Sequence, residues 1–195
     1  MFIVAASDEA GQALEAACWV VAATASKLVL AGDHLQLPPT IHSSRAQAGL
    51  EVTMMERMVG LYGEEVTRML TTQYRMHHLI MDWSSAALYS GRLVAGQAVA
   101  SQRLFELPGV ERSEETEAVL LLFDTAGCGM VELTTQDEIS RANEGEAGLV
   151  CHHVERLIRQ GVQPSQIAVV TPYNLQVCSL FYNNVGIIYV LRWSC

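Results

Sequence analysis

Polar side chains that can bind phosphate and metal follow two apolar stretches near the start of the chain. The carboxylates Asp8 and Glu9 come directly after FIVAAS, and Asp33 and Gln36 follow KLVLAG within the string GDHLQLPP. At the carboxyl edge of a parallel sheet, one carboxylate can hold Mg²⁺ and the next can orient an attacking water. Asp33 and Gln36 can reach a γ-phosphate, its metal or that water, and the two prolines stiffen the turn. The GDHLQLPP string is the more specific signal, because a bare Asp-Glu pair is more often a solvated turn.

A second set of candidates lies in QYRMH, from Gln73 to His77. The ring of Tyr74 can stack on a base, and the guanidinium of Arg75 can act as an arginine finger on a γ-phosphate. For this string taken alone, a half-buried tyrosine and a surface ion pair are the favoured explanation of the same two residues. In TPYNLQ, Thr171 and the backbone amides after it can bind a phosphate of a nucleic-acid strand. The plainer alternative is an Asn or Tyr cap of the next helix.

Two other strings suggest different chemistry. DTAG, which begins at Asp124, also occurs in small GTPases, but Lys27 is the only lysine, so these 195 residues contain no GxxxxGK[ST] loop. Cys151, His152 and His153 suggest a metal, yet adjacent helical residues point about 100° apart and no second ligand pair has suitable spacing. A buried strand AVLLLFD and a core histidine at position 153 are the preferred interpretations.

The elements that must position these residues alternate between strands and helices. Apolar runs predict strands at FIVAAS, KLVLAG, RMLTTQYR, AVLLLFDT and IAVVTPY. Helical spacing predicts helices over 12–24, 52–62, 76–89 and 143–160. Asn143 and Glu146 form a capping-box pattern at the start of the last helix, and Gly161 ends it. This alternation indicates an α/β fold with a parallel sheet covered on both faces.

The composition indicates a folded, intracellular protein. Half of the residues are hydrophobic and 17% are charged, which excludes a disordered chain. No apolar run is long enough to span a membrane. The N-terminal stretch MFIVAASDEA lacks the positively charged residues with which a signal peptide begins. Five scattered cysteines without a CxxC pair favour a reducing compartment. The net charge of −9 argues against a broad nucleic-acid surface.

Four strings together resemble the Walker B motif and the later motifs of superfamily 1 helicases of the 5′→3′, nonsense-decay type. They are DEAGQALE, AGDHLQLPPT, QYRMHHLIMDW and VVTPYNLQV, and DTAGCG points the same way. The resemblance covers roughly 7–177 and implies a RecA-like P-loop NTPase fold, with parallel sheets flanked by helices and incomplete at both ends. It implies that 1–70 belongs to a first RecA-like domain and 71–177 to a second. Residues 178–195 form a tail outside the family pattern.

The resemblance also implies ATP and Mg²⁺ as cofactors, and it assigns roles by motif. Asp8 would hold the Mg²⁺ ion, and Glu9 would be the base that activates water. Asp33 and Gln36 would face the nucleotide, with Gln36 sensing the γ-phosphate.

The later motifs supply the remaining implied roles. Tyr74 would line the adenine site and Arg75 would be the first arginine finger. Thr171, Pro172 and Tyr173 would lie along the nucleic-acid strand. The implied partners are single-stranded DNA or RNA through a longer parent protein, and a ribonucleoprotein, with no membrane. The implied location is the cytoplasm and nucleus.

The sequence departs from the family pattern at both ends. The phosphate-binding loop would lie upstream of Met1, and Ser7 is polar where the family is usually apolar. After Val177 the tail CSLFYNNVGIIYVLRWSC fails to continue the pattern, so we expect it to come from translation past an exon boundary. Without the loop lysine and a second arginine finger, we expect the isolated chain neither to bind ATP tightly nor to hydrolyse it.

Three hypotheses follow from these observations. The first is a fragment of an ATP-dependent 5′→3′ DNA and RNA helicase. The second is an inactive truncated isoform or gene-model fragment that acts at most as a binding module, which the single lysine and the unusual tail favour for the chain by itself. The third is a nucleic-acid-binding module that uses TPYNLQ alone, and the net charge of −9 counts against it.

Overall fold

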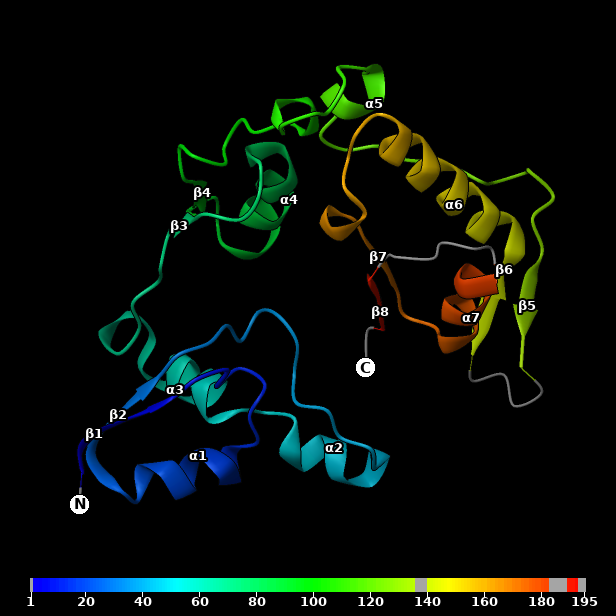
Figure 1. The fold of residues 1–195 in the computed structure, drawn as a ribbon. Helices are drawn as coiled ribbons and strands as arrows, with labels where there is room; N and C mark the ends of the chain where they lie inside the picture. The colour runs from blue at the N-terminus through cyan, green and yellow to red at the C-terminus, as the bar shows by residue number, and fades with distance from the viewer. Residues whose placement is uncertain (1, 136–139, 183–188, 193–195) are drawn as a thin grey trace. The chain divides into compact units, whose positions relative to one another are not determined.

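The described part of the chain forms two compact units. A computed structural model describes residues 2–135, 140–182 and 189–192, and the units are Met1–Thr71 and Thr72–Cys195. Within the described residues the strands form four separate two-stranded sheets, three of them parallel and one antiparallel (Figure 1). The mixture of helices and small parallel sheets agrees with the predicted α/β class, but it is not one continuous covered sheet.

The first unit is built on two parallel strands joined by a helix. β1 (Phe2–Ser7) pairs with β2 (Ala25–Leu30), and α1 (Glu15–Ala22) connects them. The helices that follow are α2 (Ser44–Leu50), α3 (Met54–Tyr62) and the 3₁₀ turn η1 (Gly63–Glu65). The predicted helix 12–24 begins later than expected, because the Gln12 N–H is used in a turn and donates to the Glu9 carbonyl at 2.9 Å.

A side-chain network joins α1 to α3. Arg57 Nε donates to Glu15 at 2.9 Å, and Trp19 Nε1 donates to the same carboxylate at 3.0 Å. Arg57, and then Trp19, hold the pKa of Glu15 below its ordinary value. α3 begins where the sequence predicts within two residues, because the Thr53 hydroxyl accepts the Glu56 N–H at 3.1 Å and caps the helix.

The second unit contains the remaining elements. They are β3 (Thr72–Gln73), α4 (His78–Leu88), β4 (Val94–Ala95), η2 (Leu104–Glu106), α5 (Glu114–Glu117), β5 (Glu132–Thr134), β6 (Arg141–Asn143), α6 (Glu144–Arg159), η3 (Pro164–Gln166), β7 (Ala168–Thr171), α7 (Asn174–Tyr182) and β8 (Tyr189–Arg192). β3–β4 and β7–β8 are parallel, and β5–β6 is antiparallel. Within the C-terminal tail, residues 189–192 form β8, and residues 183–188 and 193–195 lie outside the described residues.

The longest helix, α6, has the predicted start and end. The Asn143 side chain accepts the Glu146 N–H at 3.1 Å and caps the helix. At the other end, Gly161 has a φ of +99°, its N–H donates to the Ile158 carbonyl, and the Val162 N–H donates to the Leu157 carbonyl. These two bonds make a Schellman motif, which is why the chain leaves the helix at a glycine.

The core of the second unit lies between α6 and α7. Ala147 and Cys151 of α6 are buried against Leu180 of α7, and Val150 and Val169 pack around them. Burial raises the pKa of the Cys151 thiol, with Glu155 adding to the effect. Val154 of α6 is also buried, whereas Ile158 is exposed.

The prediction of a buried strand at AVLLLFDT is wrong. Residues 118–125 form no strand, and Leu122 is 93% exposed. No strand of the described chain pairs with this segment, so its apolar side chains have no sheet to cover. RMLTTQYR is likewise reduced to the two residues of β3, and β1 is exposed because its sheet has only two strands. No helix in the described chain combines the length and the apolar character needed to cross a membrane.

Candidate nucleotide and strand sites

The turns after β1 and β2 are bonded to each other through their backbones. The Ala31 N–H donates to the Ser7 carbonyl at 2.8 Å, and the Ala10 N–H donates to the Ala31 carbonyl at 2.8 Å. The parallel pairing therefore continues past the ends of both strands. As a result, the chain segments that carry Asp8, Glu9 and Asp33 lie at the same edge of this sheet.

Two glycines make this approach possible. A Cβ atom on Gly11 would lie 2.5 Å from the Asp33 carbonyl oxygen, and one on Gly32 would lie 2.8 Å from the Ala10 nitrogen. Gly32 also has a φ of +154°, which other residues rarely adopt. Both positions therefore require glycine. This explains the glycine before Gln12 and the glycine before Asp33 in the sequence.

The Asp8–Glu9 turn holds two carboxylates exposed to solvent. Asp8 Oδ1 accepts the Glu9 N–H at 3.0 Å, and Gln12 Nε2 donates to Glu9 Oε2 at 3.1 Å. Glu9 has a φ of +50°, a left-handed conformation that is uncommon for a residue other than glycine. Non-glycine residues in strained conformations gather at functional sites, so this backbone geometry marks Glu9 for a test of function.

The turn after β2 repeats the pairing of a carboxylate with a glutamine three residues on. Asp33 Oδ1 accepts the Leu35 N–H at 3.0 Å, and Gln36 Nε2 donates to Asp33 Oδ2 at 2.8 Å. Gln12 makes the matching bond in the first turn and was missed by sequence reasoning. Its signal was present, because DEAGQ has the same acid-to-glutamine spacing as DHLQ.

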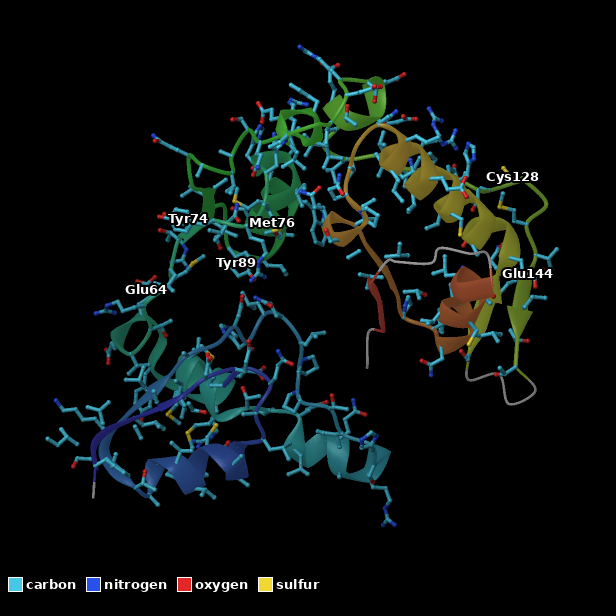
Figure 2. The ribbon with its side chains drawn as sticks, in the orientation of Figure 1. Glu64, Tyr74, Met76, Tyr89, Cys128 and Glu144 are labelled. Carbon is cyan, nitrogen blue, oxygen red and sulfur yellow. The ribbon has the colours of Figure 1, made fainter. Side chains whose placement is uncertain are left out.

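The QYRMH turn is organised by the side chain of its first residue. Gln73 Oε1 accepts the N–H groups of Arg75 and Met76 at 2.8 and 2.7 Å, and Gln73 Nε2 donates to the Met76 carbonyl at 2.7 Å. Figure 2 shows Tyr74 and Met76 on this turn, between β3 and α4. The guanidinium of Arg75 is exposed and has no hydrogen bond or ion pair within the described part of the chain.

The ring of Tyr74 lies against a glycine and is open to solvent elsewhere. A Cβ atom on Gly96 would lie 2.5 Å from Tyr74 Cδ1, and Tyr74 is 72% exposed. One part of the ring therefore rests on the backbone after β4. The exposed remainder can stack on a planar group.

His77, at the end of the same motif, has a structural role. Its Nδ1 accepts the Leu79 N–H at 3.1 Å and caps α4. Burial lowers the pKa of His77, and the neighbouring His78 and Arg103 lower it further. The imidazole that caps the helix is therefore neutral, since a protonated ring has no acceptor.

The TPY turn lines a pocket of about 320 Å³ in the second unit. Thr171 is buried, and its hydroxyl accepts the Tyr173 N–H at 3.4 Å, whereas Pro172 and Tyr173 are exposed. The pocket is also lined by polar groups from β5, β6, α6 and α7. They are Glu132, Arg141, Asn143, Glu146 and Gln176. With two acids and one arginine at its rim, the pocket itself is not basic.

The residues that suggested a GTPase loop or a metal site do not belong to these turns. Asp124 Oδ1 accepts the Ala126 N–H at 2.9 Å, and the Thr125 hydroxyl donates to Glu146 at 2.9 Å, so DTAG is a hydrogen-bonded loop rather than the end of a strand. Cys151 is buried in the core, and the ring of His153 lies 5.1 Å from that of Phe123. The thiol and this imidazole are occupied by packing.

The structure thus places the candidate site residues in three separate groups. Asp8, Glu9, Asp33 and Gln36 share one sheet edge in the first unit. In the second unit, Tyr74 and Arg75 share one turn, and residues 171–173 share another.

Comparison with known proteins matches nearly the whole chain. Two family models, both described as AAA domain, match residues 2–44 and 50–184. The second match covers more than half of the chain.

Several relatives match about nine tenths of the chain. DNA-binding protein SMUBP-2 of Mus musculus is 52% identical over 177 residues, which are 90% of this chain and 18% of that protein. DNA polymerase alpha-associated DNA helicase A of Schizosaccharomyces pombe is 38% identical over 175 residues, 87% of this chain and 26% of that protein. An ATP-dependent helicase of Methanocaldococcus jannaschii is 31% identical over 182 residues, 90% of this chain and 26% of that protein. The chain thus spans about a fifth to a quarter of these relatives, and it belongs to the AAA-domain family of superfamily 1 helicases of the nonsense-decay type.

Proposed function

We propose that this chain is part of an ATP-dependent 5′→3′ helicase that couples ATP hydrolysis to the unwinding of DNA or RNA. The observation that carries the proposal is the bonded pair of turns after β1 and β2, which keeps three carboxylates and two glutamine amides at one sheet edge. The carboxyl ends of parallel strands are where α/β proteins bind ligands. The relatives named as helicases support the same reading.

The donor set at this edge fits a magnesium nucleotide. Mg²⁺ takes oxygen ligands and usually needs only one or two carboxylates in addition to phosphates and water. We assign Asp8 as the metal ligand and Glu9 as the base that accepts a proton from water. Gln36 hydrogen-bonds to the γ-phosphate, and Asp33 orients Gln36 through the bond between their side chains. Bound Mg²⁺ would supply charge neutralisation at the phosphates.

The QYRMH turn supplies two further groups in this proposal. Arg75 brings a positive charge to the γ-phosphate, where an arginine finger contributes about 10³–10⁵ in rate. Tyr74 stacks on the adenine ring. The exposure of both side chains supports these roles, because each is free to meet a ligand.

The TPY turn is the proposed contact to a nucleic-acid strand. Pro172 and Tyr173 are exposed, and a tyrosine ring can stack on any base. Thr171 is buried and its hydroxyl accepts the Tyr173 N–H, so in this proposal it shapes the turn that presents Pro172 and Tyr173. We propose single-stranded DNA or RNA as the partner, a ribonucleoprotein as the larger assembly, and the cytoplasm and nucleus as the location.

The finer fold assignment is also a proposal. Residues 1–70 would form part of a first RecA-like domain and residues 71–177 part of a second, each with a parallel sheet flanked by helices. The short parallel pairs β1–β2 and β7–β8 support this assignment.

A chimera tests the proposed activity. The 177 matched residues of the mouse relative are replaced by those of this chain, and ATP hydrolysis is measured with and without single-stranded DNA. We expect hydrolysis that the strand stimulates, at a rate within about tenfold of the mouse protein. A folded chimera that binds ATP but does not hydrolyse it, beside an active mouse protein, would contradict the proposal.

The 195-residue chain by itself provides a second measurement. It contains no GxxxxGK[ST] loop, because Lys27 is its only lysine. We therefore expect no ATP hydrolysis above background from the chain alone. Strand-stimulated hydrolysis by the purified chain would show that its phosphate-binding group is one that we have not identified.

A further inference from the structure

The start of α7 is attached to a segment more than thirty residues earlier in the chain. Gln176, in the first turn of α7, places its side-chain amide against the backbone of Asn143 at the end of β6. Its Oε1 accepts the Asn143 N–H at 2.6 Å, and its Nε2 donates to the Asn143 carbonyl at 3.3 Å. One amide side chain thus pairs with both polar groups of one residue.

This pairing explains why the capping box of α6 is only half formed. The Asn143 side chain caps the helix by accepting the Glu146 N–H. In a full capping box, the Glu146 side chain would reach back to the Asn143 N–H. Here Gln176 takes that N–H, and the Glu146 carboxylate accepts from Thr125. The Asn143 N–H therefore donates to Gln176 and not to Glu146.

Two other contacts hold the same helix in register. The Leu175 N–H donates to the Ser140 hydroxyl at 2.9 Å, which supplies an acceptor for an otherwise unpaired N–H in the first turn of α7. Leu180, one helical turn after Gln176 and on the same face, is buried against Ala147 and Cys151. The pairing of Gln176 with the Asn143 backbone, called the clamp below, and the bond from Leu175 to Ser140 fix the start of α7. The apolar contact of Leu180 fixes the middle of the helix.

The clamp adjoins the proposed strand contact. Gln176 and Asn143 line the same pocket as Thr171, Pro172 and Tyr173. The Val177 N–H donates to the Tyr173 carbonyl at 3.2 Å, so the TPY turn leads directly into the clamped helix. Movement of the start of α7 would therefore move the exposed rings of Pro172 and Tyr173.

We propose that Gln176 is a positioning residue that fixes the TPY turn for strand binding by pairing with the Asn143 backbone. The proposal rests on the strand contact of the proposed function. Gln176 is half-buried, uncharged and bonded within the protein, so it acts through the turn and contributes no phosphate contact of its own.

Hydrogen exchange in the full 195-residue chain tests the clamp directly. In Gln176→Leu the Asn143 N–H loses its acceptor, and we expect its exchange rate to rise about tenfold, the equivalent of one hydrogen bond. Ser140→Ala should instead speed exchange at the Leu175 N–H. Gln176→Glu keeps an oxygen facing the Asn143 N–H but replaces the donor to the Asn143 carbonyl with a second oxygen, so exchange at that amide should be slower than in Gln176→Leu and faster than in the unaltered chain. Gln102→Leu, the same change at an exposed glutamine, should change neither amide.

Binding of labelled oligothymidylate to the chimera with the mouse relative, over a series of NaCl concentrations, tests the positioning role. We expect Gln176→Leu to raise Kd about three- to tenfold and to leave the salt slope unchanged, because no phosphate contact is removed. Gln102→Leu should leave Kd unchanged.

Three results would overturn parts of this account, and they are distinguishable. Unchanged protection of Asn143 in a folded Gln176→Leu chain would remove the clamp. Faster exchange with unchanged Kd would remove the positioning role. Absence of oligothymidylate binding by the unaltered chimera, beside a mouse protein that binds it, would overturn the strand contact itself, even where exchange shows that the clamp is present.

Discussion

The edge of β1–β2 and the region around α6 and α7 both place polar side chains after parallel strands, but they hold them by different means. At the first edge the side-chain bonds are local, from Glu9 to Gln12 and from Asp33 to Gln36, and the two turns meet through their backbones. Around α7 the bonds run to residues more than thirty positions away, over a buried apolar core. The first arrangement leaves the carboxylates of Asp8 and Glu9 exposed to solvent. The second attaches the start of α7 to residues that are distant in the sequence.

The backbone contact at the first edge should be the most sensitive point. Gly32→Ala places a Cβ atom 2.8 Å from the Ala10 nitrogen, in a conformation that suits glycine. We expect a loss of about 4 kcal/mol in the free energy of unfolding of the first unit, measured by urea denaturation. Gly60→Ala is the control, because Gly60 lies within α3 with no atom within 4 Å of an added Cβ. It should stabilise the chain by about 0.5–1 kcal/mol.

The apolar core should be the next most sensitive point. Leu180 is 2% exposed, so Leu180→Ala should lower the free energy of unfolding of the second unit by about 3 kcal/mol. Leu122→Ala removes the same atoms from a side chain that is 93% exposed, and it should change stability by less than about 0.5 kcal/mol. Equal effects of the two changes would show that segment 118–125 is packed, contrary to the structure.

A smaller effect is expected at the cap of α6. Asn143→Ala removes the side-chain acceptor of the Glu146 N–H and should cost about 1 kcal/mol, while the backbone bonds to Gln176 remain. Ser43→Ala is a matched change at the start of α2, where the serine side chain makes no capping bond. Thermal unfolding of both variants would measure the difference, and no greater cost for Asn143→Ala would argue against the cap.

The smallest effect is a dependence of stability on pH. Burial lowers the pKa of His77 in the folded chain, so the unfolded chain binds more protons as the pH falls below about 6.5. Stability should therefore be fully present above that pH and decline below it. His77→Asn keeps a capping acceptor that does not titrate, and it should remove this part of the decline. Urea denaturation at several pH values between 5 and 8 would give the free energy of unfolding of the unaltered chain and of His77→Asn. The difference between the two, plotted against pH, measures the contribution of His77.

The contrast between the two regions also explains what the sequence could predict. The site motifs are local strings, so Asp8, Glu9, Asp33 and Gln36 could be identified by their spacing. The start and end of α6 could be predicted for the same reason, since Asn143 and Gly161 act on their own neighbours. Gln12 repeats a visible spacing but was passed over.

Long-range partners could not be predicted in this way. The pairing of Gln176 with Asn143 joins two residues whose intervening sequence gives no indication of contact. The strand expected at AVLLLFDT failed for a related reason, because an apolar run becomes a buried strand only where a neighbouring strand pairs with it. Periodicity alone does not specify that neighbour.

Substitution of Glu9 in the chimera is the most direct test of the central claim. Glu9→Gln removes the proposed base with little change in size, and Glu51→Gln makes the same change at the exposed end of α2. We predict that Glu9→Gln lowers strand-stimulated ATP hydrolysis by about 10²–10⁴ with ATP binding retained, and that Glu51→Gln has no effect. Hydrolysis by Glu9→Gln equal to that of the unaltered chimera would contradict the assignment of this sheet edge as the nucleotide site.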